Sequence, residues 1–155
     1  MQPKGVLLQA LSKNLCEDVA AGKQAVKGAH RPLLVEDRAR VIDSLDLDSY
    51  CHKLGPSDPR WDYLIGVKGG TDTWVVAVEV HPARDDQVDA MISKAKAARR
   101  VLRSECQKDP VDGLWHWLAS KNVDCSRGGV TERRLKEAGI AFPKTRLSIP
   151  RDLSR

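Results

Sequence analysis

Residues 59–82, PRWDYLIGVKGGTDTWVVAVEVHP, predict a β-hairpin around which the rest of the chain is arranged. Two apolar runs, Trp61–Val67 and Trp74–Val80, are rich in β-branched and aromatic residues, and a turn containing Gly69 and Gly70 separates them. This composition is typical of two strands joined by a short turn. We therefore expect the sheet of this protein to be built outward from the hairpin.

Polar side chains interrupt the two strands near their ends. Asp62 lies at the start of the first strand, and Glu79 and His81 lie at the end of the second. Because strand side chains alternate between faces, Glu79 and His81 are expected to point to the same side. A carboxylate in a strand suited to burial is costly unless it is paired or binds a metal. Glu79 is therefore expected to have an ionic partner or a cation.

Length and composition predict one globular domain over residues 1–150, followed by a flexible tail over residues 151–155. Charged residues make up 30% of the 155 residues, and the hydrophobic set makes up 41%. No apolar run approaches the roughly 20 residues that span a bilayer, and the N-terminus lacks a secretion-signal pattern. Four widely spaced cysteines without a CxxC pair favour a reduced chain, although their even number leaves disulfides open. We expect a cytoplasmic protein without a membrane partner, and the net charge of +5 permits nucleic acid as a partner.

Apolar periodicity predicts helices over residues 6–21, 85–106 and 131–138, the last of them capped by Thr131. On the long second helix, Arg99 is expected within the apolar stripe, Lys96 on its margin and Lys94 facing away. A charged group on the buried side of a helix needs a partner, so Arg99 or Lys96 should reach a carboxylate or a phosphate, unless Arg99 extends to solvent at the helix end.

Further strands are predicted over Gly113–Ala119, parallel to a hairpin strand, and over Thr145–Ile149 at a sheet edge. Pro82 is expected to end the second hairpin strand. Between residues 33 and 50, the pattern fits either a strand over Arg38–Ser44 or a short helix capped by Ser44 or Asp43. The acidic residues interleaved in this region are interpreted as a solvated loop. His116, a lone histidine among apolar residues, is expected to be a core histidine with its hydrogen bonds satisfied, and not a ligand.

The predicted order of helix, strand, strand, strand, helix and strand indicates an α/β fold with a mixed β-sheet flanked by helices. Within it, Pro59-Arg60-Trp61-Asp62 and Glu79-Val80-His81 resemble the motif of the PD-(D/E)XK nuclease superfamily, which has a restriction-endonuclease-like core. The resemblance covers residues 1–120 in element order, but only these few positions in motif.

The resemblance implies a metal-dependent nuclease that hydrolyses phosphodiester bonds in DNA or RNA with Mg²⁺ or Mn²⁺. Asp62 and Glu79 would bind the cation, with the carbonyl of Val80 as a third oxygen and Glu17 from the first helix as a further ligand. A divalent cation neutralises charge on the scissile phosphate and acidifies a water molecule, and Mg²⁺ prefers oxygen ligands. His81 stands where the family usually has lysine, and a neutral imidazole can accept a proton from water.

Several alternatives remain open from the sequence. Lys96 or Arg99 could replace the missing motif lysine from the following helix. Nucleic acid would be contacted by a set of basic side chains: Arg60, Lys96, Arg99 and Arg103. In a purely structural arrangement, Asp62 and Glu79 would instead form internal ion pairs with Arg60, Arg99 or Lys96. The protein would then be a catalytically inactive module that binds nucleic acid or protein, or an interaction protein of toxin or immunity type, and a homodimer is compatible with either.

Overall fold

The computed structural model describes residues 5–55 and 57–153, and the predicted hairpin lies at the centre of its main sheet. Strands β4 (Tyr63–Gly69) and β5 (Asp72–Arg84) pair antiparallel, with Tyr63 opposite Val78 and Gly69 opposite Asp72. Gly70, in the turn between them, has a φ of 63°. A glycine adopts this left-handed conformation without steric cost, which explains the glycines of the turn.

The main sheet has six strands in the order β1-β3-β4-β5-β6-β7. Strands β1 (Ala20–Ala21), β3 (Arg40–Asp46), β4 and β5 pair antiparallel with one another in this order. Strands β6 (Trp115–Asp124) and β7 (Ile140–Lys144) continue the sheet in parallel. The predicted α/β class with a mixed sheet is confirmed, and β6 runs parallel to β5 as expected.

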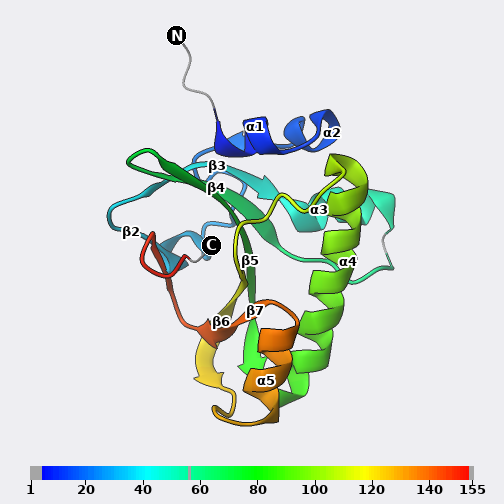
Figure 1. The fold of residues 1–155 in the computed structure, drawn as a ribbon, viewed down its shortest axis with the longest axis vertical. Coiled ribbons are helices and arrows are strands. Elements are labelled where there is room, and N and C mark those ends of the chain that lie inside the picture. The colour runs from blue at the N-terminus through cyan, green and yellow to red at the C-terminus, as the bar shows by residue number, and fades with distance from the viewer. Residues whose placement is uncertain (1–4, 56, 154–155) are drawn as a thin grey trace.

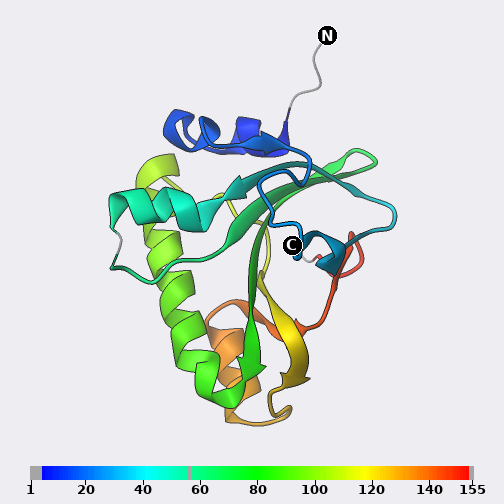
Figure 2. The same ribbon diagram turned by 180° about the vertical axis from the view of Figure 1, so that it is seen from behind.

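The helices gather on one face of this sheet. The long helix α4 (Val88–Cys106) runs along the molecule, and α5 (Val130–Glu137) lies beside its first half (Figures 1 and 2). Apolar residues of α1 (Val6–Ala10), α3 (Leu47–Leu54), α4 and α5 join one core cluster with the sheet. The other face packs against a second cluster that includes β2 (Leu34–Glu36) and β8 (Leu147–Ile149), which form a small parallel sheet. In the described part of the chain, helices therefore cover one face, and the small sheet with residues 22–33 covers the other.

The first predicted helix, over residues 6–21, is wrong in its extent. It is divided into α1 and α2 (Lys13–Cys16), and the chain then enters β1. Leu11 is extended, and the side chain of Ser12 accepts a hydrogen bond from the backbone N–H of Leu15, so a new helix begins there. A serine that caps a helix in this way competes with continuation of the preceding helix.

The region between residues 33 and 50 forms a strand and then a helix, but the predicted cap at Ser44 or Asp43 is wrong, because both residues lie within the strand β3. Strand β3 ends at Asp46, and Asp46 caps α3 by accepting a hydrogen bond of 2.9 Å from the N–H of Ser49. The solvated-loop interpretation is wrong for Asp43, which is only 3% exposed. Its carboxylate accepts hydrogen bonds of 3.0 Å from the N–H of Leu7, at the start of α1. Asp43 is therefore satisfied by a helix terminus far away in sequence.

Three predictions after the hairpin also need correction. Pro82 does not end β5, which continues to Arg84 past a register shift in its pairing with β6, where the missing N–H of proline is tolerated. Thr131 does not cap α5, because its hydroxyl donates to Asp85 instead. The strand expected over residues 145–149 is β8, which pairs with β2 outside the main sheet, and β7 was not predicted.

Residues 151–153 contact the rest of the fold. Residues 151–152 form a turn, Asp152 accepts a hydrogen bond of 2.7 Å from the N–H of Ser148, and Leu153 packs against the second core cluster. Residues 154–155, which belong to the predicted flexible tail, lie outside the described residues. No helix in the described part of the chain is long and apolar enough to cross a membrane.

Candidate active site

The structure brings Asp62 and Glu79 together on the helix-covered face of the sheet. The register of β4 and β5 places Asp62, just before β4, next to Glu79. The backbone N–H of Asp62 donates to Oε1 of Glu79 over 2.8 Å, and the N–H of Val80 donates to Oδ2 of Asp62 over 3.0 Å. The two carboxylates are thus held side by side by reciprocal hydrogen bonds across the hairpin.

Lys94 neutralises Glu79 from the first half of α4. Its Nζ lies 2.6 Å from Oε2 of Glu79. The Glu79 side chain is 1% exposed, whereas the Lys94 side chain is 24% exposed. Glu79 is therefore buried beneath an ammonium group that itself reaches solvent.

Both carboxyl groups are electrostatically perturbed. Burial, together with the charge of Asp62, raises the pKa of Glu79 to about 7, and the ion pair with Lys94 opposes this rise. Burial also raises the pKa of Asp62, against the hydrogen bond from Val80. Two neighbouring acids with raised pKa values favour the approach of positive charge.

His81 lies on the same side as Glu79, as the alternation of strand side chains predicted. Its Nδ1 is 3.8 Å from Oε2 of Glu79, and its Nε2 is 2.7 Å from Oε1 of Gln87, in the 3₁₀ turn η2 (Asp85–Gln87). In the tautomer that donates from Nε2 to the amide oxygen of Gln87, Nδ1 would be the proton acceptor on the side of the carboxylate pair.

Tryptophan side chains hold the backbone on both sides of the site. Trp61 is buried and packs edge-on against Trp115, with ring centroids 5.0 Å apart. The indole N–H of Trp117 donates to the carbonyl of His81 over 3.1 Å. These contacts fix the strand segments that carry Asp62 and His81.

The prediction that Lys94 faces away is wrong, and the structure does not place Lys96 or Arg99 at the carboxylates. Lys96 is exposed and lines a shallow hollow between α4 and α5. Lys94 comes six residues after the start of α4 and Arg99 eleven, roughly 9 Å and 16 Å along the axis. The packing of α4 on the sheet brings Lys94 to Glu79, and the sequence alone does not show this.

Arg99 has the partner that its position on the buried side requires. Its guanidinium donates to the carbonyl of Ala138 over 2.8 Å and lies over the ring of Trp115, 4.8 Å from the centroid. Arg99 therefore satisfies the C-terminal end of α5 rather than a carboxylate at the site. Arg103 is exposed further along α4.

Two other predicted residues contact different parts of the fold: Arg60 pairs with α3, and Glu17 lies at the end of α2. Arg60 forms an ion pair of 2.8 Å with Asp48 of α3. Glu17 is exposed at the end of α2, and Ser12, which caps α2, contacts Glu105. Glu105 follows Lys94 by eleven residues, roughly 16 Å along α4. Glu17 therefore belongs to the opposite end of the helix from the site.

The donor set matches a hard divalent cation in chemical type. Asp62 and Glu79 supply carboxylate oxygens, and Mg²⁺ is commonly bound through one or two carboxylates together with water and substrate phosphate. Within the described residues, no group of three or more histidine, cysteine, aspartate or glutamate side chains is placed to hold a metal ion. Lys94 holds Oε2 of Glu79, so a cation that approaches this oxygen would meet the ammonium group there.

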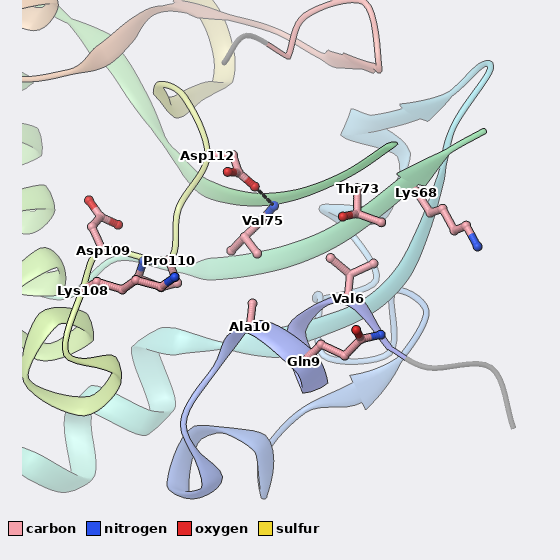
Figure 3. A pocket seen from close by; sticks show the side chains of 10 residues that line it. All are labelled: Val6, Gln9, Ala10, Lys68, Thr73, Val75, Lys108, Asp109, Pro110 and Asp112. Carbon is pink, nitrogen blue, oxygen red and sulfur yellow. Dashed lines mark hydrogen bonds between the residues drawn. The ribbon is translucent and has the colours of Figure 1, made fainter. Parts of the chain in front are cut away.

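A hollow of about 550 Å³ lies elsewhere, between α1, the β4–β5 hairpin and the loop after α4 (Figure 3). Its lining mixes charged, polar and apolar side chains: Val6, Gln9, Ala10, Lys68, Thr73, Val75, Lys108, Asp109, Pro110 and Asp112. Val75 precedes Glu79 by four residues, roughly 13 Å along a strand. The chemistry of the carboxylate pair is therefore not located in this hollow.

Comparisons with protein-family models, with curated proteins and with solved structures gave no match. A functional assignment therefore depends on the side chains at the site and on the order of the elements that carry them.

Proposed function

We propose that this protein is a metal-dependent nuclease of the PD-(D/E)XK type, with Asp62, Glu79 and Lys94 as its central residues. The observation that supports this proposal is the pair of adjoining carboxylates, one just before β4 and the other on β5, with a lysine ammonium 2.6 Å from the second of them. The elements β4, β5, α4 and β6 follow one another as expected for such a core, whereas α3 is inserted between β3 and β4.

The chemistry follows from the charges of the site. A divalent cation bound there would neutralise charge on the scissile phosphate and acidify a water molecule. Asp62 and Glu79 would supply its protein oxygens, and the carbonyl of Val80 remains a third candidate. Lys94 would place its ammonium against a phosphate oxygen or the attacking water, as the motif lysine does in the family. Nδ1 of His81, oriented by Gln87, would accept a proton from that water.

A second candidate function is supported by the burial of Glu79. With 1% exposure and both carboxylate oxygens accepting hydrogen bonds, Glu79 also suits a closed structural ion pair. On that arrangement the protein would be a catalytically inactive module that binds nucleic acid or a protein partner. Its binding to nucleic acid would weaken with salt, because phosphate contacts release counterions.

The test is cleavage of single- and double-stranded DNA and RNA by the purified protein, with Mg²⁺, Mn²⁺ or a chelator. We expect cleavage that needs the cation and that falls by more than about tenfold in Glu79→Gln, because loss of even outer partners of a metal site costs 10–100-fold. Glu137→Gln is the matched control, since Glu137 is exposed on α5.

Cleavage that persists in the chelator, or that Glu79→Gln leaves unchanged, would contradict the nuclease proposal. Salt-dependent binding without cleavage by the wild type would favour the inactive module instead.

A further inference from the structure

We propose that Lys94 is an internal substitute for the cation, so that its ammonium and a divalent ion bind Glu79 in competition. This inference rests on the proposed function in that it assumes a cation site at Asp62 and Glu79. It adds that metal loading must displace Lys94 from Glu79, which frees the ammonium for the substrate phosphate.

The hydrogen bonds of Glu79 define the competition. Oε1 accepts from the backbone N–H of Asp62 over 2.8 Å, a bond fixed by the hairpin itself. Oε2 accepts from Nζ of Lys94 over 2.6 Å, a bond to a long and flexible side chain. A cation that approaches Glu79 would therefore meet Lys94 at the oxygen that the backbone does not hold.

The charges of the site favour exchange over simultaneous binding. Lys94 balances one of the two adjoining carboxylates, whereas a divalent cation balances both. Lysine and cation at the same oxygen would repel each other across a largely buried site, where like charges are weakly screened.

Lys94 can leave Glu79 without disturbing the fold. Its side chain is 24% exposed, and Glu79 is the one acidic group at ion-pair distance from it in the described part of the chain. Long lysine stems reposition their charged end toward water at little cost. After displacement the ammonium would still lie beside the site, since α4 remains packed on the sheet.

The primary test is Mg²⁺ binding measured by isothermal titration calorimetry on the full chain, well above pH 7, so that Glu79, with its pKa of about 7, is ionised in the wild type. We expect Lys94→Met to bind Mg²⁺ at least about tenfold more tightly than the wild type, because close charge pairs couple by 1.5 kcal/mol or more. Lys96→Met is the matched control: Lys96 lies two residues further along α4, is exposed, and should leave affinity almost unchanged.

A second measurement needs no variant and so does not depend on the folding of Lys94→Met. In the wild type, the ¹⁵N-detected signal of the Lys94 ammonium should show slow hydrogen exchange without metal because of its ion pair. We expect it to shift and exchange faster as Mg²⁺ is added, with a midpoint equal to the calorimetric dissociation constant.

The outcomes separate this inference from the proposed function. Tighter binding in Lys94→Met supports the exchange whether or not the wild type cleaves nucleic acid. Equal or weaker binding in Lys94→Met, with an ammonium signal unmoved by Mg²⁺ and active wild-type nuclease, overturns the exchange alone. Absence of Mg²⁺ binding in both proteins overturns the exchange and the metal-dependent nuclease together.

Discussion

Replacing His116 should remove much of the acid sensitivity of this fold. His116 lies on β6, is 2% exposed, and its side chain belongs to the sheet face opposite the carboxylate pair. Its Nδ1 has no hydrogen-bond partner in the described part of the chain. Burial, assisted by the nearby charge of Lys144 and opposed by Asp152, lowers its pKa to about 4.

The magnitude follows from proton linkage. An unfolded histidine titrates near pH 6.5, so between about pH 6.5 and pH 4 the unfolded chain binds a proton that the folded chain does not. Above pH 6.5 this group therefore has no effect on the free energy of unfolding. As the pH falls toward 4, proton uptake by the unfolded chain lowers that free energy. A difference of 2.5 pKa units, from 6.5 to about 4, amounts to about 3 kcal/mol at roughly 1.4 kcal/mol per unit.

The assay is urea unfolding at a series of pH values, comparing the wild type with His116→Leu. We expect the variant to be at least as stable as the wild type at neutral pH, because the change removes a buried nitrogen without a partner. Its advantage should grow by about 3 kcal/mol toward pH 4. His52→Asn serves as the control, since His52 is exposed on α3 and should leave the acid limb unchanged. A free-energy difference between wild type and His116→Leu that does not change with pH would refute the reasoning.

Two further predictions concern stability, each measured by urea unfolding. A Cβ added at Gly66 would lie 2.0 Å from Oδ1 of Asp43, so Gly66→Ala should cost at least the roughly 1–3 kcal/mol typical of overpacking. Gly28→Ala is the control and should be nearly neutral, because nothing lies within 4 Å of the added Cβ. Equal effects of the two substitutions would contradict the close packing at Gly66. Asp46→Ala should cost about 1 kcal/mol, because it removes the cap on the N–H of Ser49; an unchanged midpoint would show that this cap does not stabilise α3.

Local pattern predicted the hairpin, most of α4 and the first half of β6, because each carries enough period-2 or period-3.6 apolar residues to define its buried face. It did not predict β7. This strand of five residues contains Pro143 and lies at the end of the sheet, where a missing backbone N–H costs little. Its strand conformation comes from pairing with β6 and not from its own composition.

The adjacency of Asp62 and Glu79 was also accessible from the sequence. A two-stranded antiparallel register, once fixed by a short turn, places residues opposite each other whatever surrounds them. Burial of Asp43 was not accessible, since its partners at the start of α1 precede it by 35 and 36 residues. Such a contact exists only when α1 is packed against β3.

The chain by itself determined that β4 and β5 meet and which carboxylates lie there, because turn geometry and side-chain alternation act over a few residues. Tertiary structure alone decided that Lys94, and not Lys96 or Arg99, lies on Glu79. The rotation and height of α4 on the sheet are set by the packing of its whole apolar face, and neighbouring lysines on a helix point in directions about 200° apart. The packing of α4 on the sheet therefore decides which ammonium group pairs with Glu79.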